Sequence, residues 1–185
     1  MLIIPGIIAS SYPRVSNSYE SIATVTVGAG GSSSADFTSI SNAYKQLQIR
    51  YIGRGTAALD EVALRIRFNS DTGSNYARHI LEGNGASASA FAASSGNLMA
   101  CGSVSGSTAT ASAFGAGIID ILDYTNTNKN KTIRVLDGID RNGGGVIDFT
   151  SGLWINTNAI TSISLFADSG NLAQYSSFAL YGVKG

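Results

Sequence analysis

Apolar and polar residues alternate with a period of two through most of the chain. In the clearest run, residues 62–68, apolar side chains alternate with Ala63, Arg65 and Arg67. Successive side chains of a β-strand point to opposite faces, so this pattern predicts a strand with one buried face. Similar runs predict further strands at residues 23–27, 47–51, 76–81, 118–124, 132–136, 146–155, 160–166 and 177–183.

Turn-forming residues separate these runs. Clusters of Gly, Asn and Asp lie at residues 69–73, 126–130 and 141–145, and these residue types favour tight turns between antiparallel strands. We find no convincing helical pattern. We therefore expect an all-β fold built as an antiparallel β-sandwich, and we prefer a jelly roll to an immunoglobulin-like arrangement.

The beginning of the chain follows a different pattern. Residues 1–19 are rich in apolar side chains, but Pro5-Gly6 and Tyr12-Pro13 interrupt any regular element. We expect an extended N-terminal arm that reaches roughly 50 Å, followed by a single β-sandwich domain over residues 20–185. Such an arm docks either on its own domain or on a partner. The residues assigned to partner docking are Leu2, Ile3, Ile4, Pro5, Ile7, Ile8 and Tyr12.

A segment at about residues 83–117 is dominated by Gly, Ala and Ser. Small side chains are typical of flexible linkers, and they also let neighbouring backbones approach closely. Apolar residues such as Phe91, Met99 and Phe114 punctuate the segment, which a linker does not need. We favour an ordered loop or insertion at a subunit contact over a disordered linker.

The overall composition narrows the classes of partner. Only 13% of the residues are charged, and 12 basic residues balance 12 acidic ones. This balance disfavours binding to nucleic acid, whereas a sparse, neutral charge distribution favours self-association. No apolar run has the length of a membrane span. The single cysteine, Cys101, excludes an internal disulfide and is expected to be buried.

Two sequence motifs resemble catalytic ones. Asp71-Thr-Gly and Asp168-Ser-Gly are similar to the paired loops of aspartic proteases. However, no apolar strand leads directly into Asp71, and Asp and Gly are common in hairpin turns. His79 has no accompanying nucleophile elbow, so a structural role is favoured for it. We expect no enzymatic activity.

Other candidate sites use metal ions or sugars. Asp137, Asp140 and Asn142 offer oxygen ligands for calcium, but their spacing does not match an EF-hand loop and favours a turn. We expect no metal and no cofactor. Trp154, the one tryptophan, is interpreted first as a core residue between the sheets. The alternative is an exposed platform for a glycan.

Several stretches resemble a family of small virion proteins of tailed bacteriophages. The resemblance spans nearly the whole chain and is weakest across the Gly/Ala/Ser-rich segment. The resembling stretches are residues 4–11, 19–28, 47–50, 67–79, 120–124, 152–154 and 176–182. The family comprises capsid decoration (cement) proteins, head fibres and tail appendages. The resemblance implies a β-rich, trimeric structural protein located on the virion, and it carries no catalytic motif.

These observations lead to one preferred function. The chain is expected to be a capsid decoration protein that is made in the host cytoplasm and placed on the outer capsid surface. Its partners would be the major capsid protein, reached through the apolar arm, and other copies in a homotrimer. The alternative is a receptor-binding module of a tail or head fibre, with a host surface glycan as partner and Trp154 as a contact.

Overall fold

The computed structural model describes residues 18–184. The seven residues assigned to partner docking, from Leu2 to Tyr12, lie outside this range, so the prediction of an N-terminal docking arm stays a prediction. Within the described range the chain folds into strands joined by turns, and no helix occurs there.

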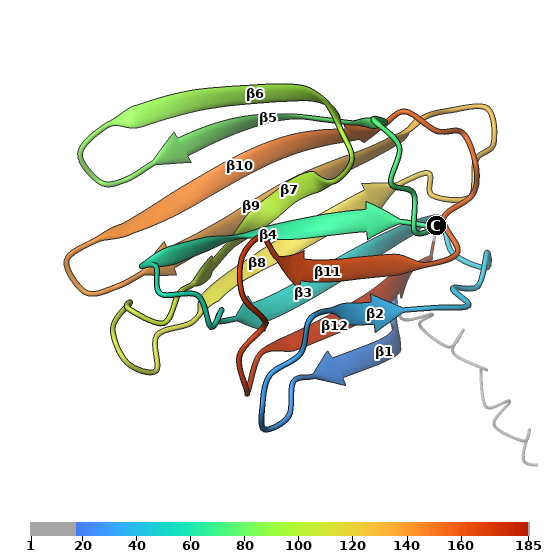
Figure 1. Ribbon diagram of the computed structural model, residues 1–185. Helices are drawn as coiled ribbons and strands as arrows, with labels where there is room; N and C mark the ends of the chain where they lie inside the picture. Colours follow the sequence, from blue (N-terminus) through green and yellow to red (C-terminus); the bar gives the residue numbers. More distant parts are fainter. Residues whose placement is uncertain (1–17, 185) are drawn as a thin grey trace, which may run out of the picture.

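The strands form two antiparallel sheets that pack as a sandwich (Figure 1). The large sheet has eight strands in the order β1-β12-β3-β8-β9-β10-β5-β6, and the small sheet has four in the order β2-β11-β4-β7. In chain order the strands are β1 (Tyr19–Thr26), β2 (Ala35–Phe37), β3 (Gln46–Gly53), β4 (Glu61–Phe68), β5 (Tyr76–Gly83), β6 (Ala88–Gly96), β7 (Met99–Ser105), β8 (Gly115–Leu122), β9 (Lys131–Asp140), β10 (Gly145–Trp154), β11 (Ile163–Ala167) and β12 (Ser177–Val183).

The predicted all-β antiparallel sandwich is confirmed. The finer assignment to a jelly roll is not confirmed, because a jelly roll places eight strands in its two sheets, whereas β1 to β12 divide unequally here. Each strand predicted from alternation is present, with its ends displaced by a few residues. Strands β2, β6 and β7 were not predicted.

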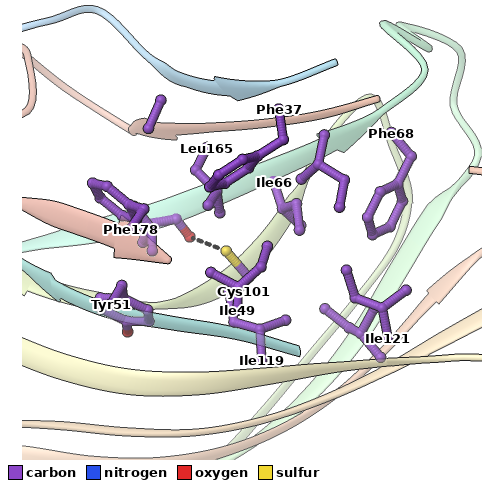
Figure 2. Close-up of a cluster of buried hydrophobic side chains, with 14 of the residues drawn as sticks. Phe37, Ile49, Tyr51, Ile66, Phe68, Cys101, Ile119, Ile121, Leu165 and Phe178 are labelled. Carbon is purple, nitrogen blue, oxygen red and sulfur yellow. Dashed lines mark hydrogen bonds between the residues drawn. The ribbon is translucent and has the colours of Figure 1, made fainter. Parts of the chain in front are cut away.

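The core lies between the sheets and follows the alternation. In β4 the apolar positions are buried, and Ala63, Arg65 and Arg67 on the opposite face are only partly covered. Figure 2 shows side chains from both sheets meeting in this core, among them Phe37, Ile66, Leu165, Ile49 and Phe178. Cys101 is buried among them, as predicted, and its thiol donates a hydrogen bond to the Leu64 carbonyl oxygen (3.6 Å).

The Gly/Ala/Ser-rich segment is an integral part of the sandwich and is not an insertion. It supplies β6 at the edge of the large sheet, β7 in the small sheet and the first residues of β8. Every residue of β7 is buried, because this strand also lies against β8, β9, β10 and β5 of the large sheet. Small side chains permit this close approach; a Cβ atom at Gly102 would lie 2.2 Å from the Tyr51 hydroxyl oxygen.

Candidate interaction surface

One end of the large sheet reverses the usual burial pattern. In β10, Asp148 and Thr150 point inward and are buried, whereas Ile147 and Phe149 point outward and are exposed. The neighbouring strand β9 shows the same reversal at one position, where Asp137 is buried beside exposed Leu136. A sheet of a lone sandwich places its apolar face inward. The reversal therefore marks a region that the core alone does not explain.

The exposed apolar residues form a continuous cross-strand row. Ile118 on β8 pairs with Leu136 on β9, which pairs with Phe149 on β10, which pairs with Leu81 on β5. Their exposed fractions lie between 40% for Ile118 and 57% for Leu81. Side chains opposite each other on adjacent strands share a face of the sheet, so these four side chains form one stripe across the outer face.

A second row runs beside the first. Ile52 on β3 pairs with Ala116, and Ile147 on β10 pairs with Gly138 and Gly83. The absence of side chains at the two glycines leaves Ile147 66% exposed. Together the two rows make up what we call the apolar face, defined by Ile52, Leu81, Ile118, Leu136, Ile147 and Phe149.

Shallow hollows shape the apolar face. One of about 360 Å³ lies beside Leu81 and Phe149, and another of about 560 Å³ lies beside Ile118, Leu136 and Ile147. Such hollows suit the insertion of apolar side chains from a partner surface. Large contiguous apolar patches are uncommon on monomeric proteins and mark interaction sites.

A polar row borders the apolar face on one side. Gln48, Asp120 and Arg134 follow one another on β3, β8 and β9, with Ser151 and His79 next along the row. Gln48 donates to Asp120 (2.8 Å), and Arg134 pairs with the same carboxylate (3.1 Å). An apolar centre with a hydrogen-bonded polar border is the usual anatomy of a protein–protein interface.

The two protease-like motifs have structural roles. The Asp71 carboxylate accepts hydrogen bonds from the Gly73 amide, the Asn75 side chain and the Trp154 indole (2.8–2.9 Å). These bonds hold the pKa of Asp71 below its usual value. Asp168 instead pairs with Arg65 at 2.8 Å. Each carboxylate thus has its own partners, and the structure does not bring the two motifs together as an acid pair.

Trp154 lies in the core. Its side chain is fully buried, stacks on Tyr76 with 6.3 Å between ring centroids, and packs on Phe68. The interpretation of Trp154 as a core residue is therefore correct. Its assignment as a glycan contact is wrong, because the ring face that would stack on a sugar is covered by other aromatic rings.

The remaining candidates also separate in space. His79 is exposed on the outer face, at the polar border. Asp140 accepts a hydrogen bond from the Asn142 amide within its turn (2.8 Å), whereas Asp137 points into the interior and accepts from the Ser103 amide (2.8 Å). Across residues 18–184, no three ligating side chains converge as a metal site would require.

Sequence reasoning missed the apolar face because alternation identifies two faces of a strand without stating which one is buried. The sequence of β10 does alternate polar with apolar residues, but either the odd-numbered or the even-numbered residues could point inward.

No family model, curated protein or solved structure matches the chain.

Proposed function

We propose that this protein is a structural protein of a bacteriophage virion, and specifically a capsid decoration protein that assembles through the apolar face. The single observation that carries the proposal is this exposed apolar face, backed by a rigid sandwich. The proposed arm, which ends before β1 begins at Tyr19, docks on the major capsid protein, and the apolar face packs on a second copy within a homotrimer.

The size of the apolar face supports assembly by several weak contacts. Burying the exposed part of one such side chain contributes roughly 1 kcal/mol, so the six residues together contribute on the order of 6 kcal/mol per face. Association opposes this with an estimated 4–15 kcal/mol of lost translational and rotational freedom. One contact alone therefore gives marginal binding, whereas in a closed trimer each copy is held by two such contacts and the ring is more stable than a pair. The three arms of one trimer then bind the capsid far more tightly than one arm through effective concentration.

A second copy is the occupant that the charges favour. The six residues of the apolar face carry no charge, and the whole chain has a formal net charge of zero, so two copies meet without long-range repulsion. Substituting Leu136 or Phe149 with Lys would place a charge in the buried contact, which is costly without a partner. The matched control is Arg134→Lys on the polar border, which keeps the charge.

The oligomer is tested by light scattering on the purified full-length protein. The wild type and R134K are expected to form trimers, and L136K and F149K are expected to give monomers with unchanged circular dichroism. Trimers that persist in both Lys variants would show that the apolar face is not the contact between copies.

Capsid docking is tested separately with capsids that lack the protein. The full chain is expected to bind them, and a variant without residues 1–13 is expected to lose binding while remaining folded. Undiminished binding by the shortened chain would refute docking through the arm. The alternative function, glycan recognition on a fibre, predicts instead a specific signal on a glycan array from the isolated protein.

A further inference from the structure

The interior counterpart of the apolar face is a polar cleft. It has a volume of about 160 Å³ and lies between β5 and β10 of the large sheet and β4 and β7 of the small sheet. Glu61, Glu82 and Asp148 line one end, Arg65 and Arg78 line the other, and small or apolar side chains line the space between. The cleft therefore carries opposite charges at its two ends.

The acidic end holds carboxylates that lack partners. Asp148 and Glu82 face each other across β10 and β5, with no salt bridge to either within residues 18–184. Asp148 is 5% exposed, and its buried Oδ1 has no hydrogen-bond partner among the described residues. Glu61 differs, since Arg141 (3.1 Å) and Ser103 (2.8 Å) already bind it.

A buried hydroxyl group in the same cleft also lacks a hydrogen-bond partner among the described residues. Thr150 lines the cleft next to Asp148, is 1% exposed, and its Oγ1 likewise has no hydrogen-bond partner in the described part of the chain. Buried polar groups in proteins are nearly always hydrogen-bonded. Two such groups on one wall leave hydrogen-bonding capacity for a polar ligand in the cleft.

The electrostatics of the acidic end favour a cation. Burial, together with the negative charges of Glu82 and Glu61, raises the pKa of Asp148 to about 6. An ionised carboxylate in this position is destabilised unless a positive group approaches it. An organic ammonium group brings one positive charge and three N–H donors, which suits two carboxylates and a hydroxyl.

The basic end complements this with an available guanidinium group. Arg65 is occupied by Asp168 (2.8 Å), whereas the buried Nε of Arg78 has no hydrogen-bond partner among residues 18–184. Arg78 and Glu82 lie on the same face of β5, four residues apart, so their backbones are roughly 13 Å apart. A guanidinium group binds carboxylates with paired hydrogen bonds.

We propose that this cleft binds a small zwitterion, with its ammonium group at Asp148, Glu82 and Thr150 and its carboxylate at Arg78. The methylene chain of the ligand lies along Ile80, which separates the charged ends on β5. This binding site lies on the opposite side of the same strands from the apolar face.

The proposal is tested by calorimetric titration of the full chain with three probes. 6-Aminohexanoate carries both charges, 1,5-diaminopentane lacks the anion, and hexanoate lacks the cation. We expect saturable binding of 6-aminohexanoate with a Kd of about 1 mM or lower, weaker binding of diaminopentane, and none of hexanoate. The absence of saturable binding of 6-aminohexanoate would overturn the proposal, and so would equal affinity for diaminopentane.

Variants then locate the bound probe. Glu82→Gln and Arg78→Gln should each weaken the binding of 6-aminohexanoate about tenfold, and the matched surface variants Asp36→Asn and Arg134→Gln should leave it unchanged. Thr150→Val keeps the shape of the side chain and should also weaken binding. Unaltered affinity in the folded E82Q and T150V proteins would show that the probe binds elsewhere.

Discussion

The buried carboxyl group of Asp137 predicts an unusual dependence of stability on pH. Asp137 is 4% exposed, and its Oδ2 accepts a hydrogen bond from the Ser103 amide. Burial, and next the negative charge of Asp148, raises its pKa from the ordinary 3.8 to about 7. The folded protein therefore holds a proton on Asp137 under conditions in which the unfolded chain has lost it.

The sign of the effect follows from the direction of this shift. A pKa that is raised on folding stabilises the native state fully below the unfolded value, and the contribution is lost as pH rises through the folded value. The loss amounts to at most about 1.4 kcal/mol per pH unit and levels off above the folded pKa, so Asp137 removes roughly 3 kcal/mol between pH 5 and pH 8. Asp148, with a pKa of about 6, removes about 1 kcal/mol more by the same relation.

The test is Asp137→Asn, because an amide has the shape of the protonated acid and no charge. Urea unfolding at pH 5 and pH 8 can be followed by the fluorescence of Trp154, the single tryptophan, which is fully buried. The wild type should lose roughly 4 kcal/mol of unfolding free energy between the two pH values, and D137N only about 1 kcal/mol. At pH 8 the variant should therefore be the more stable protein.

Two comparisons make this result interpretable. Asp71 and Asp168 have lowered pKa values, and the stability that they contribute is lost only at lower pH, so the chosen window excludes them. Exposed Asp36 supplies the control, since D36N should keep the wild-type difference. If the wild type is equally stable at both pH values, or if D137N retains the full difference, Asp137 is not a protonated buried acid.

Two further predictions concern cations whose hydrogen bonds hold loops. Lys131 is fully buried, and its ammonium group donates to the carbonyl oxygens of three residues, at 2.6–2.9 Å. Lys131→Met should therefore cost about 3 kcal/mol of unfolding free energy, because it leaves these carbonyl groups unpaired. The control Lys129→Met, at the surface, should cost under about 1 kcal/mol. Arg54 donates to four carbonyl oxygens within residues 107–113, so Arg54→Ala should accelerate amide hydrogen exchange across that loop and Arg134→Ala should not. Wild-type urea midpoints in K131M, or unchanged exchange in R54A, would contradict these roles.

The fold class was predictable because alternation determines strands directly. The run at residues 62–68 became β4 with its apolar positions buried, and the clusters at 69–73 and 141–145 became the turns after β4 and β9. Strand β7 was missed for a physical reason: both of its faces are buried, so it has no polar face to alternate with. Short β2, with three residues, is below the length at which a period can be recognised.

The candidate surface was harder to predict, since it depends on which of the two alternating sets of side chains in a strand faces the core. In β10 the odd-numbered residues Ile147 and Phe149 point outward, and the even-numbered residues Asp148 and Thr150 point inward. Hydrophobicity alone would place Ile147 and Phe149 on the inner face. However, β10 is paired with β9 and β5 as far as Trp154, and the burial of Trp154 beside Tyr76 fixes which face of the strand points inward. A strand anchored at one end by a core tryptophan must then present its other end with polar groups inside and apolar groups outside.

This reversal links the two proposals physically. A lone domain gains nothing from exposing Phe149 while burying Asp148, because each residue would be more stable in the other's environment. An apolar partner surface outside and a polar ligand inside, as proposed above, would each stabilise this arrangement. Exchanging the two residues, as Asp148→Phe combined with Phe149→Asp, should therefore remove both the association of copies and the binding of 6-aminohexanoate while the sheet itself persists. Retention of either activity by the folded double variant would break the link between the two faces of β10.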